Sequence, residues 1–407
     1  MPECLVAVED RLPRVLLLSD EGPQTSTAGG LLLYRLLQNY PPAHMRVIER
    51  QVEPGLTRLP CRYESLMTPW RRFEQSRFNK WKRSARAFGL VPRVSLREID
   101  ELLDGFVPEV VLSVMQHACY YDTAHEYAVA RRLPLVVIVH DVNEEFEPVL
   151  SWAISAARRR DADYYRYASR RLCISPEMES LCADLYGVRG DVMYPNRSEE
   201  LQPRSFNESE TLKVPGRFTV GFVGNLNYGY GDELLRLLPA FRAAAASIVA
   251  FSSPPGEQLA ALLQAEDCFD YRGFVPAMQA WRTIQAECDA VLLPYPNSPG
   301  HLERLYRHHF PSKLPEYFAL GMPVIVTGPE YATGVRWVQR NPSAAALSLV
   351  ADALNFTNVL RSLREHPHER VMLARNGYEI GLREFEPLAI RSQFLEHLRS
   401  ATYLKGR

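Results

Sequence analysis

Short apolar runs alternate with longer amphipathic stretches along most of this 407-residue chain. The runs are rich in valine, isoleucine and leucine, a pattern typical of parallel strands buried on both faces. They cover residues 14–19, 44–50, 109–114, 135–139, 171–174 and 192–194 in the first half, and 218–223, 247–251, 269–271, 288–293, 324–326 and 344–349 in the second. Helices are expected between them. This order predicts an α/β protein with two Rossmann-like, doubly wound parallel-sheet domains.

The boundary between the two domains is expected in a polar segment near the middle of the chain. The length exceeds what one ordinary core supports, which favours two domains. Residues 197–216 show little periodicity and are predicted to link an N-terminal domain, 1–196, to a C-terminal domain, 217–385. The last residues, 386–407, are expected to form a helix that can pack back on the N-terminal domain.

The composition indicates which cellular compartment and which kinds of binding partner are expected. The hydrophobic content of 46% and the charged content of 23% are ordinary for a soluble globular protein. No window approaches the roughly 18 apolar residues of a membrane span, and the N-terminus lacks a signal-peptide core. Seven scattered cysteines without a CxxC pair indicate a reducing compartment and argue against structural zinc. A cytoplasmic protein is therefore expected, and its net charge of −1 gives no general attraction to nucleic acid.

Residues 70–88 differ from the rest, because they carry seven cations against one acid, Glu74, with aromatic residues between them. On a helix the aromatic residues and Ala85 would fall along one stripe. Such a helix can lie on an anionic membrane surface, here the inner face of the membrane, or bind an acidic acceptor. The alternative is a solvated helix whose aromatic residues pack on their own domain. Nucleic-acid binding is the weakest interpretation.

Residues 310–328, FPSKLPEYFALGMPVIVTG, predict a short helix that opens near Ser312, a glycine stop and a buried strand. Lys313 and Glu316 are three residues apart and would share one face of that helix near its N-terminus. A cation and a carboxylate in this position suit a nucleotide, with Lys313 on phosphate and Glu316 on the ribose hydroxyls. The alternative is a surface salt bridge between the two side chains.

Two positions in the first half follow predicted strands and would face a ligand. Gly29 and Gly30 lie in a loop between the strand 14–19 and a helix expected at 31–38, which is either a substrate-facing loop or a plain connector. His140 and Asp141 follow the strand 135–139, where ligands bind in open parallel sheets. A helix is expected after them, from 146 to 169.

The second half resembles the C-terminal domain of glycosyltransferases of the GT-B fold, especially the retaining family 4 and its neighbours. Four segments carry the resemblance, in order: FTVGFVGNLNYGYG (218–231), FDYRGFVP (269–276), CDAVLLPYPNS (288–298) and the stretch 310–328. The resemblance implies two domains facing a cleft, with a nucleotide-sugar held mainly by the C-terminal one. No other cofactor and no metal are implied.

The resemblance also assigns roles by position. Glu316 matches the ribose-binding glutamate, Lys313 a basic residue that meets the diphosphate, and His140 a residue near the transferred sugar. Further donor-binding residues implied are Ser312, His309, Gly224, Asn225, Asn227, Phe274, Val275, Gly29 and Gly30. His308 stands where many retaining members carry an upstream glutamate. The stereochemical course is therefore open.

Glycosyl transfer requires a stabilised nucleoside diphosphate leaving group, which Lys313 and a helix N-terminus can supply without a metal. An inverting enzyme would also need a base, for which Asp141 and His140 are the candidates; a retaining one would not. Alternatively, His140 is a core histidine and Asp141 a helix N-cap. The acceptor would be a hydroxyl of a glycan, a glycolipid or a polysaccharide precursor. An epimerase or hydrolase of the same fold, and a non-catalytic partner-binding subunit, are the alternative functions.

Overall fold

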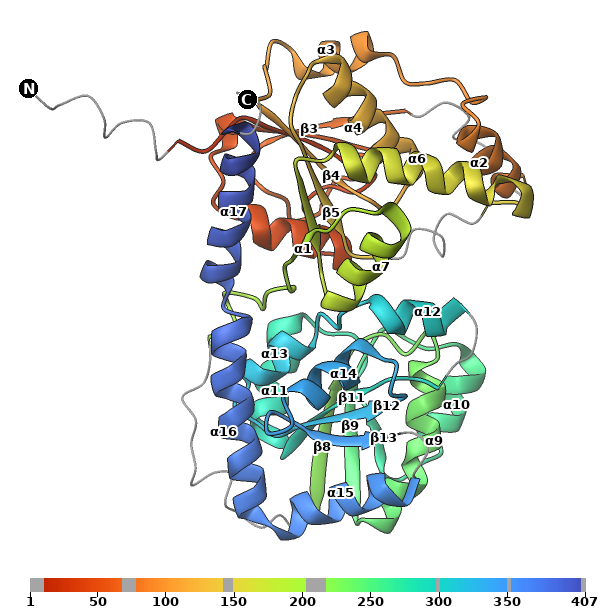
Figure 1. Cartoon of the computed structure of the whole chain (residues 1–407). Coiled ribbons are helices and arrows are strands. Elements are labelled where there is room, and N and C mark those ends of the chain that lie inside the picture. Colours follow the sequence, from red (N-terminus) through yellow and green to blue (C-terminus); the bar gives the residue numbers. More distant parts are fainter. Residues whose placement is uncertain are drawn as a thin grey trace, which may run out of the picture. The chain divides into compact units, whose positions relative to one another are not determined.

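The computed structural model describes residues 11–67, 78–141, 149–202, 217–297, 301–349 and 353–403. By its internal contacts the chain divides into two compact units (Figure 1). Unit 1 comprises Met1–Tyr194 and Leu388–Arg407, and unit 2 comprises Pro195–Pro387. Each unit contains one parallel sheet covered by helices, so the predicted α/β class with two doubly wound sheets is confirmed.

Unit 1 is built on a seven-stranded sheet in the order β3-β2-β1-β4-β5-β6-β7. The strands are β1 (Val15–Leu18), β2 (Met45–Glu49), β3 (Arg62–Ser65), β4 (Val110–Val114), β5 (Leu135–Val139), β6 (Arg170–Cys173) and β7 (Asp191–Val192). Val15 lies opposite Met45 on one side and Val110 on the other, in parallel register. The central strands β1, β4 and β5 are buried along their whole length, as continuous apolar runs predict.

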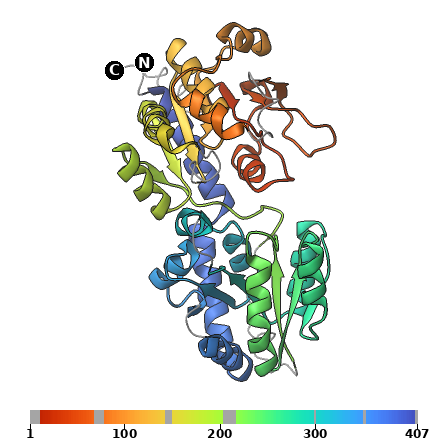
Figure 2. The ribbon, with the colours of Figure 1, turned by 90° about the vertical axis from the view of Figure 1, so that its right-hand side faces the viewer.

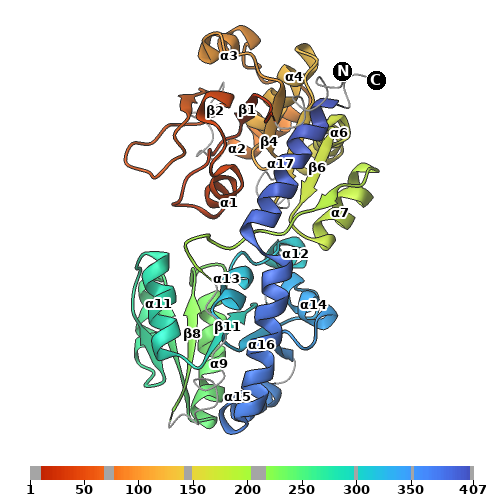
Figure 3. The same cartoon turned by 90° about the vertical axis from the view of Figure 1, so that its left-hand side faces the viewer.

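The helices of unit 1 cover both faces of this sheet (Figure 3). They are α1 (Ala28–Leu37), α2 (Asn79–Ala87), α3 (Leu96–Leu103), α4 (Ala118–Ala130), α6 (Ile154–Tyr167), α7 (Pro176–Tyr186) and α17 (Pro387–Tyr403), with 3-10 turns η1 (Pro42–His44) and η3 (Ser151–Ala153). Helices α4, α6 and α7 bury tyrosines such as Tyr121 and Tyr164 in one core. On α17, Arg391 Nε donates to the Arg35 carbonyl of α1 at 3.1 Å.

Unit 2 repeats the plan with a six-stranded sheet in the order β10-β9-β8-β11-β12-β13. The strands are β8 (Phe218–Val223), β9 (Ala246–Phe251), β10 (Phe269–Tyr271), β11 (Ala290–Pro294), β12 (Val324–Gly328) and β13 (Ala346–Leu349). The helices are α9 (Tyr230–Ala243), α10 (Glu257–Gln264), α11 (Ala277–Glu287), α12 (His301–His308), α13 (Leu314–Ala319), α14 (Thr333–Arg340), α15 (Ala353–Glu365) and α16 (Pro367–Glu384). Figure 2 shows α9, in green, beside the strands of this sheet.

Local capping explains where several helices begin. Thr27 accepts a hydrogen bond from the Gly30 backbone N–H, so α1 starts at Ala28 and not at the predicted residue 31. The Ser175 side chain accepts a hydrogen bond from the Met178 backbone N–H and so caps α7. Pro176 stands in the first turn of that helix, where proline is favoured. The helix expected from 146 is shorter, because η3 precedes α6, which starts at Ile154; residues 142–148 lie outside the described ranges.

The structure gives the bounds of two helices that the sequence indicated. The short helix expected to open near Ser312 is α13, which has six residues and begins at Leu314, with Lys313 as its N-cap residue. In the basic segment, residues 70–77 lie outside the described ranges and α2 covers Asn79–Ala87. Its buried residues are Lys82, Ser84 and Ala85, whereas Trp81 is 63% and Phe88 47% exposed, so these two aromatic side chains are not buried in their domain. No helix in the described parts of the chain combines the length and apolarity of a membrane span.

Candidate functional site

Both sheets have a switch point where the strand order reverses, between β1 and β4 in unit 1 and between β8 and β11 in unit 2. Successive crossover connections leave these central pairs in opposite directions, which opens a crevice at their carboxyl ends. Ligands of doubly wound sheets bind in this crevice. The residues that follow β1, β4, β8 and β11 are therefore the first candidates for a site.

Gly224 follows β8 directly and brings the backbone close to Lys313. Its φ of 156° lies where side chains are rarely accommodated, and a Cβ built on it would lie 1.9 Å from Lys313 Nζ. The Gly224 N–H donates to the Phe251 carbonyl at 2.9 Å, which ties the turn to β9. Only glycine leaves the space in which the lysine side chain ends.

The Lys313 ammonium rests on two aromatic rings at this switch point. Nζ lies 5.2 Å from the ring centre of Phe222 and 4.9 Å from that of Tyr230. No ion pair joins it to a carboxylate within the described parts of the chain. Burial disfavours the charged form and lowers the pKa of Lys313 to about 8. A cation in such surroundings is ready to receive an anionic ligand. The six-residue α13 contributes little dipole, so the lysine itself must carry the charge.

Glu316 is buried on the next turn and does not pair with Lys313. Its side chain is 4% exposed, and both oxygens accept from the Ser198 N–H, at 3.2 and 3.3 Å. The surface salt bridge considered from the sequence is therefore excluded. A carboxylate offers about four acceptor positions, so the shared bond from the Ser198 N–H does not by itself fill them.

Two tyrosines fix the glycine-rich turn after β8. The Tyr317 hydroxyl accepts from the Val223 N–H at 3.1 Å. Tyr306, from α12, donates to the Tyr228 carbonyl, and Tyr228 itself has a positive φ of 58°. Within the turn, Asn225 Oδ1 accepts from the Asn227 N–H at 2.8 Å. Asn225 and Asn227 are both exposed, so the turn presents polar groups beside Gly224.

The other residues of unit 2 that the sequence assigned to the donor are more widely spread. Phe274 is 75% exposed, and Val275 is half-buried. Gly273, which precedes them, has a φ of 72°, and its carbonyl accepts a hydrogen bond from the Ser252 N–H. Ser312 is exposed and His309 half-buried. Arg307, on α12, pairs with Glu303. The structure brings together Lys313, Gly224 and the turn after β8; no described contact joins Phe274 or Val275 to them.

At the switch point of unit 1, Asp20 follows β1 and His117 follows β4. Their side chains meet, with Asp20 Oδ2 at 3.1 Å from His117 Nε2. Asp20 is 9% exposed, and its second oxygen, Oδ1, is buried without a hydrogen-bond partner in the described part of the chain. Burial raises the pKa of Asp20, against the opposing effect of His117. Sequence reasoning missed this pair, although each residue stands just past the end of a predicted strand.

His140 and Asp141 lie at the end of β5, and both are buried. His140 Nε2 is 3.1 Å from Asp141 Oδ2, and Gln116 Nε2 approaches the same oxygen at 3.5 Å. Burial alone would lower the pKa of His140, but the carboxylate of Asp141 outweighs it, with Asp20 and Glu21 adding to the effect, so the pKa is raised. The Asp141 carboxylate therefore favours the protonated form of His140 at the carboxyl end of β5.

The two glycines in the first turn of α1, Gly29 and Gly30, have different surroundings. A Cβ on Gly29 would lie 3.4 Å from the His140 ring, so Gly29 borders the histidine. A Cβ on Gly30 would meet the Gln24 side chain at 2.8 Å, and its N–H is used by the Thr27 cap. Gly30 is therefore required by local packing of the loop.

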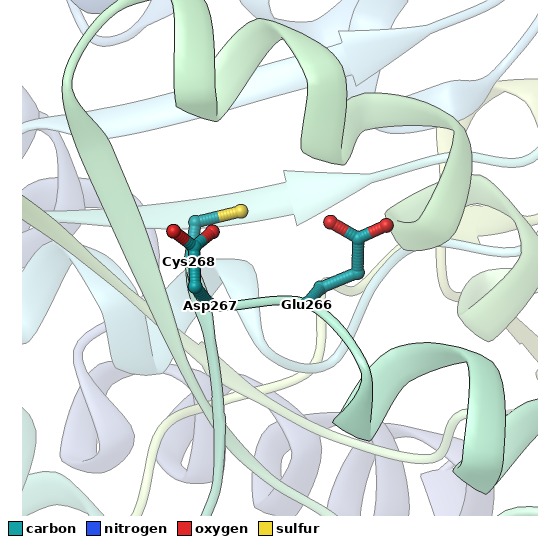
Figure 4. Close-up of side chains that lie close together, drawn as sticks. All are labelled: Glu266, Asp267 and Cys268. Carbon is teal, nitrogen blue, oxygen red and sulfur yellow. The ribbon is translucent and has the colours of Figure 1, made fainter.

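A three-residue group in unit 2 has the ligand types of a metal site: Glu266, Asp267 and Cys268 (Figure 4). They are consecutive residues at the amino end of β10, away from the carboxyl edge that carries Lys313. Glu266 is already paired with Arg242, and burial raises the pKa of the Cys268 thiol. We assign no ligand to this group.

Comparisons with known proteins bear on the fold. No protein-family model matches the sequence, and no curated protein matches it. Among solved structures, HepE from Anabaena, in complex with UDP and glucose, shares 16% identity over 95% of this chain and 100% of its own, with a TM-score of 0.65. Sucrose-phosphate synthase from Thermosynechococcus elongatus shares 14% identity over 96% of this chain and 99% of its own, with a TM-score of 0.66. An α,α-trehalose-phosphate synthase from Burkholderia vietnamiensis shares 12% identity over 96% of this chain and 98% of its own, with a TM-score of 0.63. The chain has the GT-B fold. The fold predicted from the four segments is thus confirmed.

Proposed function

We propose that this protein is a glycosyltransferase, which moves a sugar from a nucleoside diphosphate donor to an acceptor hydroxyl. The observation that carries the proposal is the Lys313 ammonium, which lies over Gly224 at the switch point of unit 2 without a carboxylate partner in the described residues. A diphosphate supplies the missing negative charge. HepE, which has the same fold, was solved with UDP and with UDP-glucose, so uridine diphosphate sugars are the first donors to test.

The donor would be bound by residues of unit 2. Lys313 and the turn after β8 hold the diphosphate, Glu316 accepts from the ribose hydroxyls, and the exposed edge at Phe274 and Val275 borders the base. Ser312, His309, Asn225 and Asn227 complete the set of residues proposed for the donor. Departure of the diphosphate leaves negative charge on its oxygens, which the ammonium stabilises without a metal ion.

On the unit 1 side we propose that His140 and Asp141 act near the transferred sugar, bordered by Gly29. If the reaction inverts, the pair takes the proton of the acceptor hydroxyl, with Asp141 holding the imidazole. If it retains, His140 stabilises the sugar or acceptor instead. Asp141→Asn separates the two mechanisms, because loss of a general base costs about a hundredfold or more in rate.

The test of function is a transfer assay after a thermal-shift screen of nucleotide-sugars. A donor that raises the melting temperature is incubated with glycan, glycolipid and polysaccharide-precursor acceptors, and product is measured by mass spectrometry. Transfer to an acceptor supports the proposal. Release of free sugar alone, or its isomerisation, would indicate the hydrolase or epimerase alternative, and absence of nucleotide binding would indicate a partner-binding subunit.

We propose further that the protein works in the cytoplasm, at the inner face of a membrane. None of the six described cysteines forms a disulfide, in keeping with a reducing compartment. Around α2, large apolar side chains are exposed: Phe78 (51%), Trp81 (63%), Phe88 (47%), Leu90 (71%) and Trp152 (56%). Phe88 stacks on Trp152 at 5.5 Å, and exposed cations such as Lys80 and Arg159 lie on the same helices, α2 and α6. Aromatic residues with cations between them suit an anionic lipid surface.

Replacing Trp81 and Trp152 by serine should therefore weaken binding to vesicles that contain anionic phospholipid by about tenfold, because each ring loses its apolar contact with the interface. Co-sedimentation with anionic and with neutral vesicles measures the effect. Leu262→Ser, which removes a 49%-exposed leucine of α10, is the matched control. Equal vesicle binding by wild type and double variant would refute the membrane proposal and leave the donor site untouched.

A further inference from the structure

Unit 1 contains a large polar pocket that none of the proposed donor-binding residues lines. Its volume is about 980 Å³, enough for a sugar-sized ligand with substituents. Asp20, Glu21 and His117 line it from the carboxyl ends of β1 and β4, so it opens at the switch point of this sheet. Lys82, Arg83 and Arg86 line it from α2. The α2 side of the pocket is therefore basic, whereas its strand side carries acidic groups together with Arg50 and Arg58, the second of which pairs with Glu49.

The buried oxygen of Asp20 points to a hydroxylated ligand. Oδ2 is held by His117, but Oδ1 has no hydrogen-bond partner among the described residues, although it is buried. A buried acceptor without a partner is rare in proteins and signals a group that the ligand supplies. Since the carboxylate only accepts, the ligand must donate an O–H or N–H.

The basic wall is fixed in place and does not depend on solvent-exposed side chains alone. Arg86 donates to Asp122 at 2.8 Å and to the Ala118 carbonyl at 2.7 Å, which fastens α2 beside the start of α4. Ser84 accepts from the Leu150 N–H at 2.9 Å. This anchoring turns Lys82 inward, where it is only 4% exposed and lines the pocket. A lysine held this way is a built contact for an anionic group.

We propose that this pocket binds the acceptor of the reaction and that the acceptor is a phosphorylated sugar, either free or as the headgroup of a lipid. Asp20 accepts from a sugar hydroxyl, and the phosphate lies on Lys82 and Arg83. The assignment as acceptor rests on the proposed glycosyltransferase function, whereas the binding of a phosphorylated sugar does not.

Isothermal calorimetry on the full chain tests the inference with three probes: glucose 6-phosphate, glucose and inorganic phosphate. Glucose 6-phosphate should bind at least tenfold more tightly than glucose or inorganic phosphate, because only it carries both a hydroxyl group for Asp20 and a phosphate for Lys82 and Arg83. Lys82→Met should weaken glucose 6-phosphate binding at least tenfold, and Lys82→Arg should restore most of it. Asp20→Asn should reduce the preference for glucose 6-phosphate over inorganic phosphate severalfold.

Lys80→Met is the matched control, since Lys80 is an exposed lysine of the same helix that does not line the pocket. Equal binding of the three probes to the wild type, or equal losses in Lys80→Met and Lys82→Met, would overturn the inference for a free phosphorylated sugar. Vesicles that bear a phosphorylated glycolipid test the lipid source separately. Vesicle binding that depends on Lys82 would assign that source, and vesicle binding that does not would overturn it as well. UDP binding to unit 2 is measured in every variant. If UDP binds and no phosphorylated sugar does, only this inference fails; if phosphorylated sugar binds and UDP does not, only the proposed function fails.

Discussion

Lys313→Met is expected to abolish measurable UDP binding while making the unliganded protein more stable. The ammonium loses hydration over Phe222 and Tyr230 and gains no carboxylate in the described structure, which lowers its pKa from 10.5 to about 8. A difference of one pKa unit corresponds to about 1.4 kcal/mol. Because the residue is half-buried and partly hydrated, we expect the methionine variant to be about 1–3 kcal/mol more stable at pH 7.

The pH dependence has a defined sign. The pKa is lower in the folded than in the unfolded state, so between about pH 8 and 10.5 the unfolded chain binds more protons and stability rises with pH. UDP binding runs the other way. The diphosphate favours the ammonium, so affinity is constant just below pH 8 and falls above it, approaching tenfold per pH unit.

Calorimetry between pH 7 and 9.5, with thermal unfolding of the unliganded protein, measures both effects. Lys80→Met, which removes an exposed lysine, should change neither UDP affinity nor its pH dependence. If Lys313→Met bound UDP like the wild type, the donor site could not be centred on this lysine. If the variant were less stable than the wild type, the ammonium would have a stabilising partner.

Glu316→Ala is expected to weaken UDP binding by an order of magnitude or more and to erase discrimination between ribose and 2′-deoxyribose. The wild-type carboxylate is held by the Ser198 N–H and keeps acceptor capacity for ribose hydroxyls. A hydrogen bond to a charged group contributes about 1.5–3 kcal/mol, which is tenfold or more in affinity.

The ribose comparison separates recognition from a structural role. The alanine variant also leaves the Ser198 N–H without its acceptor, so some loss of stability is expected in either case. Calorimetry with UDP and 2′-deoxy-UDP should show a preference in the wild type that disappears in Glu316→Ala and is partly kept in Glu316→Gln. Unchanged UDP binding in the alanine variant, or equal losses for both nucleotides, would assign Glu316 to fastening the segment that contains Ser198.

Much of this fold follows from local pattern. Continuous apolar runs identified the central strands of both sheets, because a strand covered on both faces has no polar side to show. The edge strand β3, RYES, carried no such signal, since its side chains are half-buried or exposed and its pairing with β2 depends on backbone hydrogen bonds. The sequence likewise placed Lys313 and Glu316 at the start of one short helix, α13, because the signals that start and stop a helix are local.

The local sequence pattern could not predict which side chains from different strands and helices meet. Asp20 and His117 are neighbours only because crossovers from β1 and β4 run in opposite directions, which brings together residues from distant parts of the chain. For α2 the sequence left open whether its aromatic residues pack on their own domain. The structure has Arg86 bonded to α4 and Ser84 to Leu150, and with these contacts Lys82 is the side chain that lies inward. The sequence by itself determined the two parallel sheets and the Lys313 segment, since periodicity and short spacing are local properties. Tertiary structure alone decided which charges are buried together, because that depends on strand order and on polar contacts between helices.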